Sequence, residues 1–181
     1  MDNRSTEKGL VIGISGGTCT GKTTLSNLLL EKLYSRKEPV VLNQDDFYFD
    51  EEYTGHVKIE GLNHVNWELP SAFDFPRLRR RIEDLKGEGK YVILEGITIF
   101  NDEQTAKLCD VKFFVEIDYE TCLERRRNRT YDPPDVEGYF EQVVWPEYLK
   151  NLENIANKNE IAFLKGSDSM EENLSAILKR I

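Results

Sequence analysis

Short apolar runs alternate with longer amphipathic stretches along the chain. The apolar runs end at glycine, polar or charged residues, which is typical of buried parallel strands. They occupy residues 10–14, 40–42, 91–94, 111–117 and 161–164. Between them, apolar residues at helical spacing predict helices over residues 23–36, 75–85, 119–129, 139–157 and 170–179. The alternation predicts an α/β fold, a five-stranded parallel sheet with helices on both faces.

Residues 47–66 interrupt this pattern, because they are polar and aromatic without a clear period. A long irregular segment in a compact domain is more often functional than filler. We therefore expect a flap at about residues 47–68 that covers a bound substrate. No internal repeat or Pro/Gly/Ser-rich linker divides the 181 residues, so we expect a single domain over residues 1–181.

A glycine-rich motif follows the first predicted strand directly. Residues 16–23 read Gly-Gly-Thr-Cys-Thr-Gly-Lys-Thr and match G-x4-G-K-T between a strand and a helix. In such a P-loop, backbone N–H groups converge on phosphate oxygens, and the positive end of the helix adds to them. Lys22 would reach the β- and γ-phosphates, and the Thr23 hydroxyl would bind magnesium. A chance glycine-rich turn is the alternative, which the strand and helix on either side disfavour.

The motif predicts ATP and Mg²⁺ as cofactors but does not identify the acceptor. The residues expected to bind the cofactor here are Gly16, Gly17, Thr18, Cys19, Thr20, Gly21, Lys22, Thr23 and Thr24.

Three acids follow the next predicted strands, where ligands gather in a parallel sheet. Asp45 and Asp46 come after the second strand, and Glu95 after the third. Phosphoryl transfer needs one acid to accept the proton of the acceptor hydroxyl and others to hold magnesium. We assign the proton to Asp45, and the magnesium site to Thr23, Asp45 and Glu95. For Asp46, a role at the acceptor and a role as a turn or helix cap both stay open.

Arginines crowd the end of the helix predicted over residues 119–129. Arg125 and Arg129 stand four residues apart, so they would share a helix face and point together at a polyphosphate. Such a pair can stabilise charge on the transferring group. The alternative is a solvated face next to the negative end of the helix. A second basic cluster, residues 77–81, is interpreted as a solvated helix face.

The amino-acid composition limits the binding partners, metals and cellular locations that we expect for this protein. A net charge of -9 leaves no large cationic face, so we expect no nucleic-acid partner. The apolar runs are too short for a membrane helix, and residues 1–8 lack the apolar core of a secretory signal, so we expect a cytoplasmic or nuclear location. Three cysteines and two histidines show no metal-ligand spacing, which argues against structural zinc. We expect a monomer, with a homodimer as the alternative.

These motifs resemble the nicotinamide riboside kinases of the uridine kinase-like P-loop group. The similarity runs from residue 10 to about residue 174 and includes the P-loop, Asn-Gln-Asp-Asp-Phe-Tyr at 43–48 and Leu-Glu-Gly at 94–96. Its most specific part is Tyr-Asp-Pro-Pro at 131–134, followed by Gly-Tyr-Phe at 138–140 and Trp-Pro-Glu-Tyr-Leu at 145–149. Uridine kinases tend to carry an Arg-Gly-Arg lid there, which this sequence lacks.

The resemblance implies a P-loop nucleoside/nucleotide-kinase-like fold with a lid at about residues 125–138. It implies further ATP contacts at Arg125, Arg129, Tyr131, Asp168 and Ser169, the last two near the adenine. It implies acceptor contacts at Asp45, Asp46, Phe47, Tyr48, Trp67, Glu68, Arg126, Tyr131 and Asp132. The residues expected to take part in catalysis are Asp45, Lys22 and Arg125.

The sequence departs from the family pattern at Glu68, where family members usually have an aspartate that binds the ribose hydroxyls. A carboxylate with one extra methylene still accepts both hydroxyls, but the ribose must shift. Trp67 and Tyr131 would sandwich a cationic pyridinium ring, a contact worth ~0.5–2 kcal/mol. The alternative is that either aromatic is a core residue or loop anchor.

Asp132 stands where the family often has a neutral amide, so a carboxamide on the ring should be preferred to a carboxylate, unless Arg126 cancels this charge.

The expected activity is ATP-dependent phosphorylation of the 5′-hydroxyl of nicotinamide riboside, which yields nicotinamide mononucleotide for NAD biosynthesis. One alternative is a uridine/cytidine kinase or another small-alcohol kinase of the same group. Another is a non-catalytic switch that binds nucleotide without an acceptor, which Asp45 and the arginine cluster disfavour.

Overall fold

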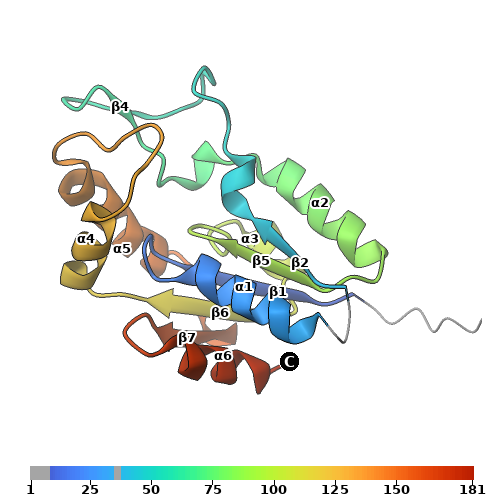
Figure 1. Ribbon diagram of the computed structural model, residues 1–181. Coiled ribbons are helices and arrows are strands. Elements are labelled where there is room, and N and C mark those ends of the chain that lie inside the picture. Colours follow the sequence, from blue (N-terminus) through green and yellow to red (C-terminus); the bar gives the residue numbers. More distant parts are fainter. Residues whose placement is uncertain (1–8, 35–37) are drawn as a thin grey trace, which may run out of the picture.

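The computed structural model describes residues 9–34 and 38–181. A five-stranded parallel sheet in the order β2-β5-β1-β6-β7 lies at its centre (Figure 1). The strands are β1 (Val11–Gly16), β2 (Val40–Asn43), β5 (Val92–Gly96), β6 (Val111–Glu116) and β7 (Ile161–Lys165). The predicted parallel sheet is confirmed. Residues 1–8, the segment without an apolar signal core, and residues 35–37, which include the predicted end of the first helix, lie outside the described residues.

The order in which strands are added to the sheet reverses next to β1. From β1 the chain forms β2 and β5 on one side, and later β6 and β7 on the other. Ligands of open parallel sheets bind at the carboxyl ends of the strands near such a point. The P-loop begins there at Gly16, and β5 ends at Glu95 and Gly96 one strand away.

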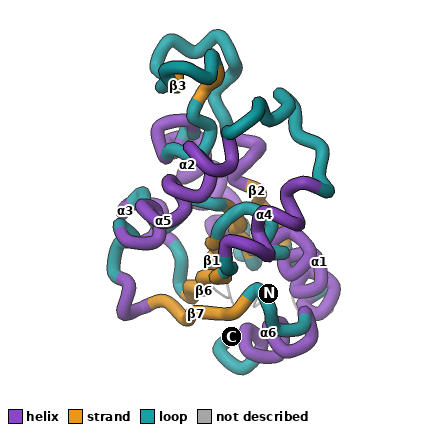
Figure 2. The backbone as a smooth tube through the Cα atoms, turned by 90° about the vertical axis from the view of Figure 1, so that its left-hand side faces the viewer, coloured by secondary structure: helices purple, strands orange, loops and turns teal. Residues whose placement is uncertain are grey.

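Helices cover both faces of the sheet, as predicted. Alternate side chains of β1 point to opposite faces: Ile12 and Ile14 pack with α1 (Lys22–Leu33) and α6 (Met170–Leu178). Val11 belongs to the other core, which includes side chains of α2 (Phe75–Gly87), α3 (Glu103–Leu108) and α5 (Trp145–Glu153). Figure 2 shows β1, β6 and β7 between α3 and α5 on one side and α1 and α6 on the other. Because β1 and β5 are buried on both faces, their apolar residues form continuous runs rather than an alternating pattern.

Two helices differ from their predictions. The helix predicted over residues 119–129 is α4 (Tyr119–Arg127), so Arg129 lies beyond its end. The helix predicted over residues 139–157 is a π-helical turn, η3 (Phe140–Val144), followed by α5. Pro146 has no N–H to give to the helix ladder, and the Trp145 N–H instead bonds to the Phe140 carbonyl oxygen five residues back. The short helix α3, capped by Asp102, was not predicted.

The flap contains more order than its sequence indicates. It begins in the 3-10 helix η1 (Gln44–Phe47), forms the antiparallel pair β3 (Lys58–Ile59) and β4 (His64–Val65), and is followed by η2 (Pro70–Ala72). Stacked or edge-to-face aromatic rings hold it together, with centroid distances of 4.0–5.3 Å along the series Phe49, Tyr53, His56 and Trp67. The flap and the lid loop lie at the same end of the molecule (Figure 1).

The remaining short element is η4 (Lys158–Glu160), which precedes β7. No helix in the described part of the chain is long and apolar enough to cross a membrane.

Candidate active site

The P-loop adopts backbone conformations that suit glycine. Gly21, the N-cap of α1, has φ 90°, in the left-handed region. A Cβ on Gly17 would lie 2.8 Å from the ring of Tyr148, so a side chain there would displace α5. The Thr20 hydroxyl donates to the Gly17 carbonyl oxygen at 3.0 Å and fastens the turn. Thr24 is exposed on the first turn of α1.

Lys22 holds its ammonium group inside this turn. The side chain is buried, and Nζ donates to the Gly17 carbonyl oxygen at 2.6 Å. Burial lowers the pKa of Lys22, while the carboxylates of Glu95 and Asp45 act in the opposite direction. Anionic phosphate oxygens at this position would further favour the charged ammonium, so the residue fits the role predicted for it.

Thr23, in the first turn of α1, meets Glu95 near the end of β5. The Thr23 hydroxyl donates to Glu95 Oε1 at 2.8 Å. Burial raises the pKa of Glu95, which Lys22 and this hydrogen bond oppose. Within residues 9–34 and 38–181, no group of three or more His, Cys, Asp or Glu side chains is placed to hold a metal ion. Magnesium usually keeps several waters and needs only one or two protein ligands besides phosphate, so Thr23 and Glu95 fit it.

Asp45 lies on η1, directly beyond the end of β2. Its N–H donates to Asn43 Oδ1 at 2.9 Å, which caps η1. The surrounding protein desolvates the carboxyl and raises the pKa of Asp45, although the side chain still reaches solvent, and Lys22 opposes this shift. Asp45 therefore lines the cavity and lies close enough to the P-loop lysine to be affected by its charge, and its role as proton acceptor stays a prediction.

Asp46 and Phe47, which follow Asp45 in η1, do not face the cavity as Asp45 does. Phe47 is buried in the core, and Arg77 lies over its ring with 4.8 Å between guanidinium carbon and ring centroid. The Asp46 side chain is exposed, and its carbonyl oxygen accepts a hydrogen bond from Arg77. Neither Asp46 nor Phe47 lines the cavity, so the prediction that they contact the acceptor is corrected. Arg77 itself is exposed, in agreement with the interpretation of residues 77–81 as a solvated helix face, whereas Arg79 is half-buried and pairs with Asp102 at 2.7 Å.

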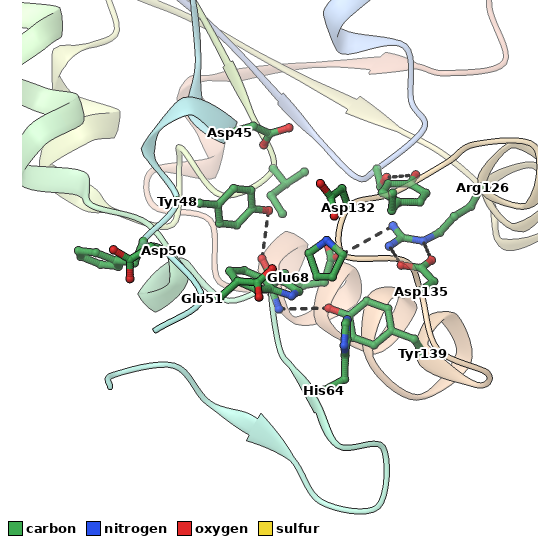
Figure 3. A pocket seen from close by; sticks show the side chains of 16 residues that line it. Asp45, Tyr48, Asp50, Glu51, His64, Glu68, Arg126, Asp132, Asp135 and Tyr139 are labelled. Atoms are coloured by element: carbon green, nitrogen blue, oxygen red, sulfur yellow. Dashed lines mark hydrogen bonds and ion pairs between the residues drawn. The ribbon is translucent and has the colours of Figure 1, made fainter. Parts of the chain in front are cut away.

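A cavity of about 440 Å³ opens between the flap, the lid and the P-loop (Figure 3). Aromatic and acidic side chains dominate its walls. Its lining residues are Thr18, Asp45, Tyr48, Phe49, Asp50, Glu51, His64, Trp67, Glu68, Ile97, Arg126, Tyr131, Asp132, Pro133, Asp135 and Tyr139. The cavity thus brings together most of the predicted acceptor residues, from segments far apart in the sequence.

Arg126 is held firmly in the wall of the cavity by an acid that the sequence analysis missed. Its Nε and Nη2 donate to the two carboxylate oxygens of Asp135, at 2.6 and 2.9 Å. Its Nη1 lies 3.7 Å from Glu68 Oε1, and its guanidinium lies 4.2 Å from the centroid of the Tyr131 ring. The sequence did not indicate that Asp135 rather than Asp132 would pair with Arg126, because the turn of the lid decides which of the two carboxylates reaches the guanidinium.

Glu68 points into the cavity from its edge. The residue is 9% exposed, and among the described residues its carboxylate accepts no hydrogen bond. Burial raises the pKa of Glu68 to about 7, although Arg126 acts in the opposite direction. Its main chain is fixed: the N–H donates to Asn66 Oδ1 at 3.1 Å, and the carbonyl accepts from Asn151 Nδ2 at 3.1 Å.

Trp67 and Tyr131 line the same cavity, as the predicted sandwich requires. The Trp67 carbonyl and N–H are held by the hydroxyls of Tyr48 and Tyr139, at 3.2 and 3.1 Å. The Tyr131 hydroxyl lies 3.4 Å from both Thr18 Oγ1 and Cys19 Sγ, which ties the lid to the P-loop. Tyr131 therefore belongs to both the nucleotide and the acceptor sides of the site.

Arg125 and Arg129 both reach the P-loop at Cys19, although not from one helix face. Arg125 donates to the Cys19 carbonyl oxygen at 3.0 Å and to the Gly166 carbonyl oxygen at 3.2 Å. Arg129, beyond the end of α4, lies with Nη1 3.8 Å from Cys19 Sγ. The two side chains thus meet at Cys19, but they do not share a helix face as the i and i+4 spacing predicted, and their joint contact with a polyphosphate stays a prediction.

The loop after β7 also borders the P-loop. Ser169 caps α6 in a capping box with Glu172, so its hydroxyl has a structural partner. A Cβ on Gly21 would lie 2.6 Å from Met170 Cε, which places the loop that carries Asp168 and Ser169 beside the P-loop. This location is compatible with the predicted place near the adenine.

Comparisons with known proteins agree with this geometry. No protein-family model matches the chain. It is 33% identical to nicotinamide riboside kinase 1 of Homo sapiens, over 91% of this chain and 88% of that protein. It is 30% identical to a uridine kinase of Mycoplasma genitalium, over 94% of this chain and 92% of that protein. Among solved structures, thymidylate kinase from Candida albicans is similar in fold, with a TM-score of 0.59 at 15% identity over 96% of this chain and 91% of that chain.

Proposed function

This chain belongs to the family of P-loop kinases that comprises the nicotinamide riboside kinases and the uridine kinases, and we propose that its acceptor is nicotinamide riboside. The proposed reaction transfers the γ-phosphoryl group of ATP to the 5′-hydroxyl and yields nicotinamide mononucleotide, a precursor of NAD. Membership of this family is sufficient to make the chain a nucleoside kinase. Only the identity of the acceptor is proposed here.

The observation that carries the proposal is the character of the cavity beside Asp45. Nicotinamide riboside has a fixed positive charge on an aromatic ring. The cavity offers aromatic walls at Trp67 and Tyr131, and six of its lining residues are acids. Aromatic faces and carboxylates both attract a pyridinium cation. A neutral pyrimidine ring would gain only the stacking.

The roles of the side chains follow from their positions. Asp45 takes the proton from the 5′-hydroxyl, and its raised pKa makes it a stronger base. Lys22 and Arg125 position the phosphates, and Thr23 with Glu95 would hold magnesium. When bound, Mg-ATP supplies the phosphoryl group and neutralises the charge that develops on it. Glu68 accepts the ribose hydroxyls, and the flap and lid exclude water that would otherwise hydrolyse ATP.

A panel of acceptors tests the proposal. Purified protein with Mg-ATP is assayed for ADP release with nicotinamide riboside, uridine and cytidine, and the products are identified by mass. We expect the highest kcat/KM for nicotinamide riboside. A higher value for uridine or cytidine would contradict the proposal and favour the pyrimidine nucleosides instead.

A uridine/cytidine kinase is the second candidate, because the similarity to the Mycoplasma genitalium uridine kinase spans nearly the full length of both chains. If no acceptor stimulates ADP release, the chain binds nucleotide without transferring the phosphoryl group.

A further inference from the structure

We propose that the acceptor cavity selects its ligand by formal charge, preferring a pyridinium riboside with a neutral carboxamide to the same riboside with a carboxylate. The inference rests on the proposed function, since it concerns which members of the pyridinium riboside class the site accepts. It assigns the selection to acids of the flap and lid that do not take part in phosphoryl transfer.

The acids stand on both sides of the cavity. Asp50 and Glu51 come from the flap, and Asp132 and Asp135 from the lid on the opposite side (Figure 3). Six of the lining side chains are carboxylic acids if Asp45 and Glu68 are included, whereas Arg126 is the only lysine or arginine among them. A ring bound between flap and lid therefore lies in a negative potential that the low-dielectric aromatic walls strengthen.

Arg126 does not cancel this potential. All three nitrogens of its guanidinium already face a carboxylate. Nε and Nη2 donate to Asp135 at 2.6 and 2.9 Å, and Nη1 lies 3.7 Å from Glu68 Oε1. One guanidinium is thus shared between two carboxylates, and no hydrogen bond or ion pair joins it to Asp132 among the described residues. Asp132, Asp50 and Glu51 are left without a cationic partner in the cavity wall.

Glu68 independently indicates that a ligand completes this cavity. The residue is 9% exposed and lines the cavity, and its carboxylate accepts no hydrogen bond from the described residues, although Arg126 Nη1 lies 3.7 Å away. A buried acceptor in this state is stabilised by donors on a ligand, such as a pair of ribose hydroxyls. With the 5′-hydroxyl at Asp45 and the ribose at Glu68, the ring extends to Trp67 and Tyr131, next to Asp132.

The carboxamide and carboxylate forms of the riboside differ by one unit of charge on the ring and are nearly the same size. A carboxylate placed among Asp50, Glu51 and Asp132 is repelled by all three, whereas the amide is not. Like charges several ångströms apart in a partly solvated site change binding by about tenfold or more. Salt screens such interactions, so the preference should shrink as ionic strength rises.

The test compares kcat/KM for nicotinamide riboside and nicotinic acid riboside in the wild type, D132N and the D50N/E51Q double variant. We expect the wild type to prefer the amide by about tenfold or more. Both variants should lower this ratio several-fold, mainly by lowering KM for the acid. The D84N variant, which removes the same charge from the exposed face of α2, is the control and should keep the wild-type ratio.

A wild-type ratio near one would overturn the inference, and so would a ratio that neither D132N nor D50N/E51Q changes. Melting curves of all variants show whether each is folded. Failure of the proposed function gives a different result, because then neither riboside would be phosphorylated in any variant.

Discussion

Asp45 is a carboxylate whose surroundings oppose its ionisation while a nearby lysine favours it. Desolvation raises its pKa and Lys22 counteracts this, so the group remains a base but a stronger one than an exposed aspartate. No other acid of η1 faces the cavity, since the Asp46 side chain points to solvent. We therefore expect Asp45, rather than Asp46, to accept the proton.

We predict that D45N lowers kcat by about 10²–10⁴-fold, the usual contribution of a general base. Nucleotide affinity should change little, because Lys22 and the P-loop backbone make the phosphate contacts. Steady-state kinetics and calorimetric titration with a non-hydrolysable ATP analogue measure the two quantities. Undiminished turnover in D45N would show that another group accepts the proton.

Glu68 gives the free protein a pH-dependent stability. Its pKa is raised from 4.5 to about 7, so folding favours the protonated form. The stability it contributes is complete below pH 4.5 and is lost as the pH rises through about 7, a change on the order of 3 kcal/mol. E68Q cannot ionise, so in the absence of ligand it should be more stable than the wild type at about pH 8, and this advantage should shrink toward about pH 5.

Thermal melts of the wild type and E68Q across this pH range measure the difference in their stability. The contributions of the other titrating groups largely cancel in this difference, because both proteins contain them. Acceptor binding should change in the opposite direction, because only ionised Glu68 accepts two ribose hydroxyls without donating a proton. The acceptor KM of the wild type should fall as the pH rises through about 7, and that of E68Q should be higher and flatter. Equal pH dependence of stability in the two proteins would contradict this account.

Among the elements, η1 and the end of β5 are joined by a buried pair of side chains. Gln44 Nε2 donates to Thr98 Oγ1 at 2.7 Å, and the Thr98 N–H donates to Gln44 Oε1 at 3.1 Å. Both residues are fully buried. A Cβ on Gly96 would lie 2.2 Å from Gln44 Oε1, so the pair also requires glycine there. Because η1 carries Asp45 and β5 carries Glu95, the pair fixes the position of the proposed proton acceptor relative to the proposed magnesium ligand.

We predict that T98V destabilises the protein by about 1–3 kcal/mol, since it leaves the Gln44 amide without a buried partner. It should also lower kcat about tenfold or more at unchanged nucleotide affinity, because a small displacement of Asp45 misaligns the hydroxyl. Chemical denaturation and steady-state kinetics measure these effects. T98S keeps the hydroxyl and should restore kcat; if T98S is as impaired as T98V, the hydrogen bond does not position Asp45.

The elements that the sequence predicts well are those specified by local pattern. The central strands β1 and β5 are buried on both faces, and each contains a continuous apolar run that stands out from its surroundings. The π-helical turn before Pro146 and the end of α4 before Arg129 depend on where individual N–H groups find partners, which periodicity does not show. The pair β3 and β4 has two residues in each strand, too few for an alternating pattern.

Across the whole molecule, the site was predictable where a motif fixes it and unpredictable where distant segments meet. The P-loop and the acids after β2 and β5 follow from one motif and one rule about parallel sheets. Asp135, Gln44 and Arg77 were not found, because their importance lies in partners 9, 54 and 31 residues away along the chain. In the sequence each is an ordinary polar residue, and only the folded structure shows its partner.

The two ligands should stabilise different parts of the molecule, because the nucleotide and acceptor sites use different segments. We expect the nucleotide contacts to lie in the P-loop, the end of α4 and the loop after β7, which Arg125 connects through Cys19 and Gly166. We expect the acceptor contacts to lie in the flap and lid. The flap is the less stable part, with short strands and exposed apolar residues such as Val57 at 48% exposure, so it should exchange its amide hydrogens readily.

Hydrogen exchange measured by mass spectrometry distinguishes these segments. A magnesium complex of a non-hydrolysable ATP analogue should slow exchange at residues 16–23 and in the loop at 166–169, and a chelator should weaken this protection because Thr23 and Glu95 then lack the ion that joins them to the phosphates. Adding nicotinamide riboside should extend protection to residues 47–68 and to the lid beyond α4, since the ring binds between them. The control is Glu83→Gln on the exposed face of α2, which should respond as the wild type does. Protection of the flap by nucleotide alone, with no further effect of the riboside, would mean that the flap closes over ATP and that the cavity beside Asp45 does not receive the acceptor.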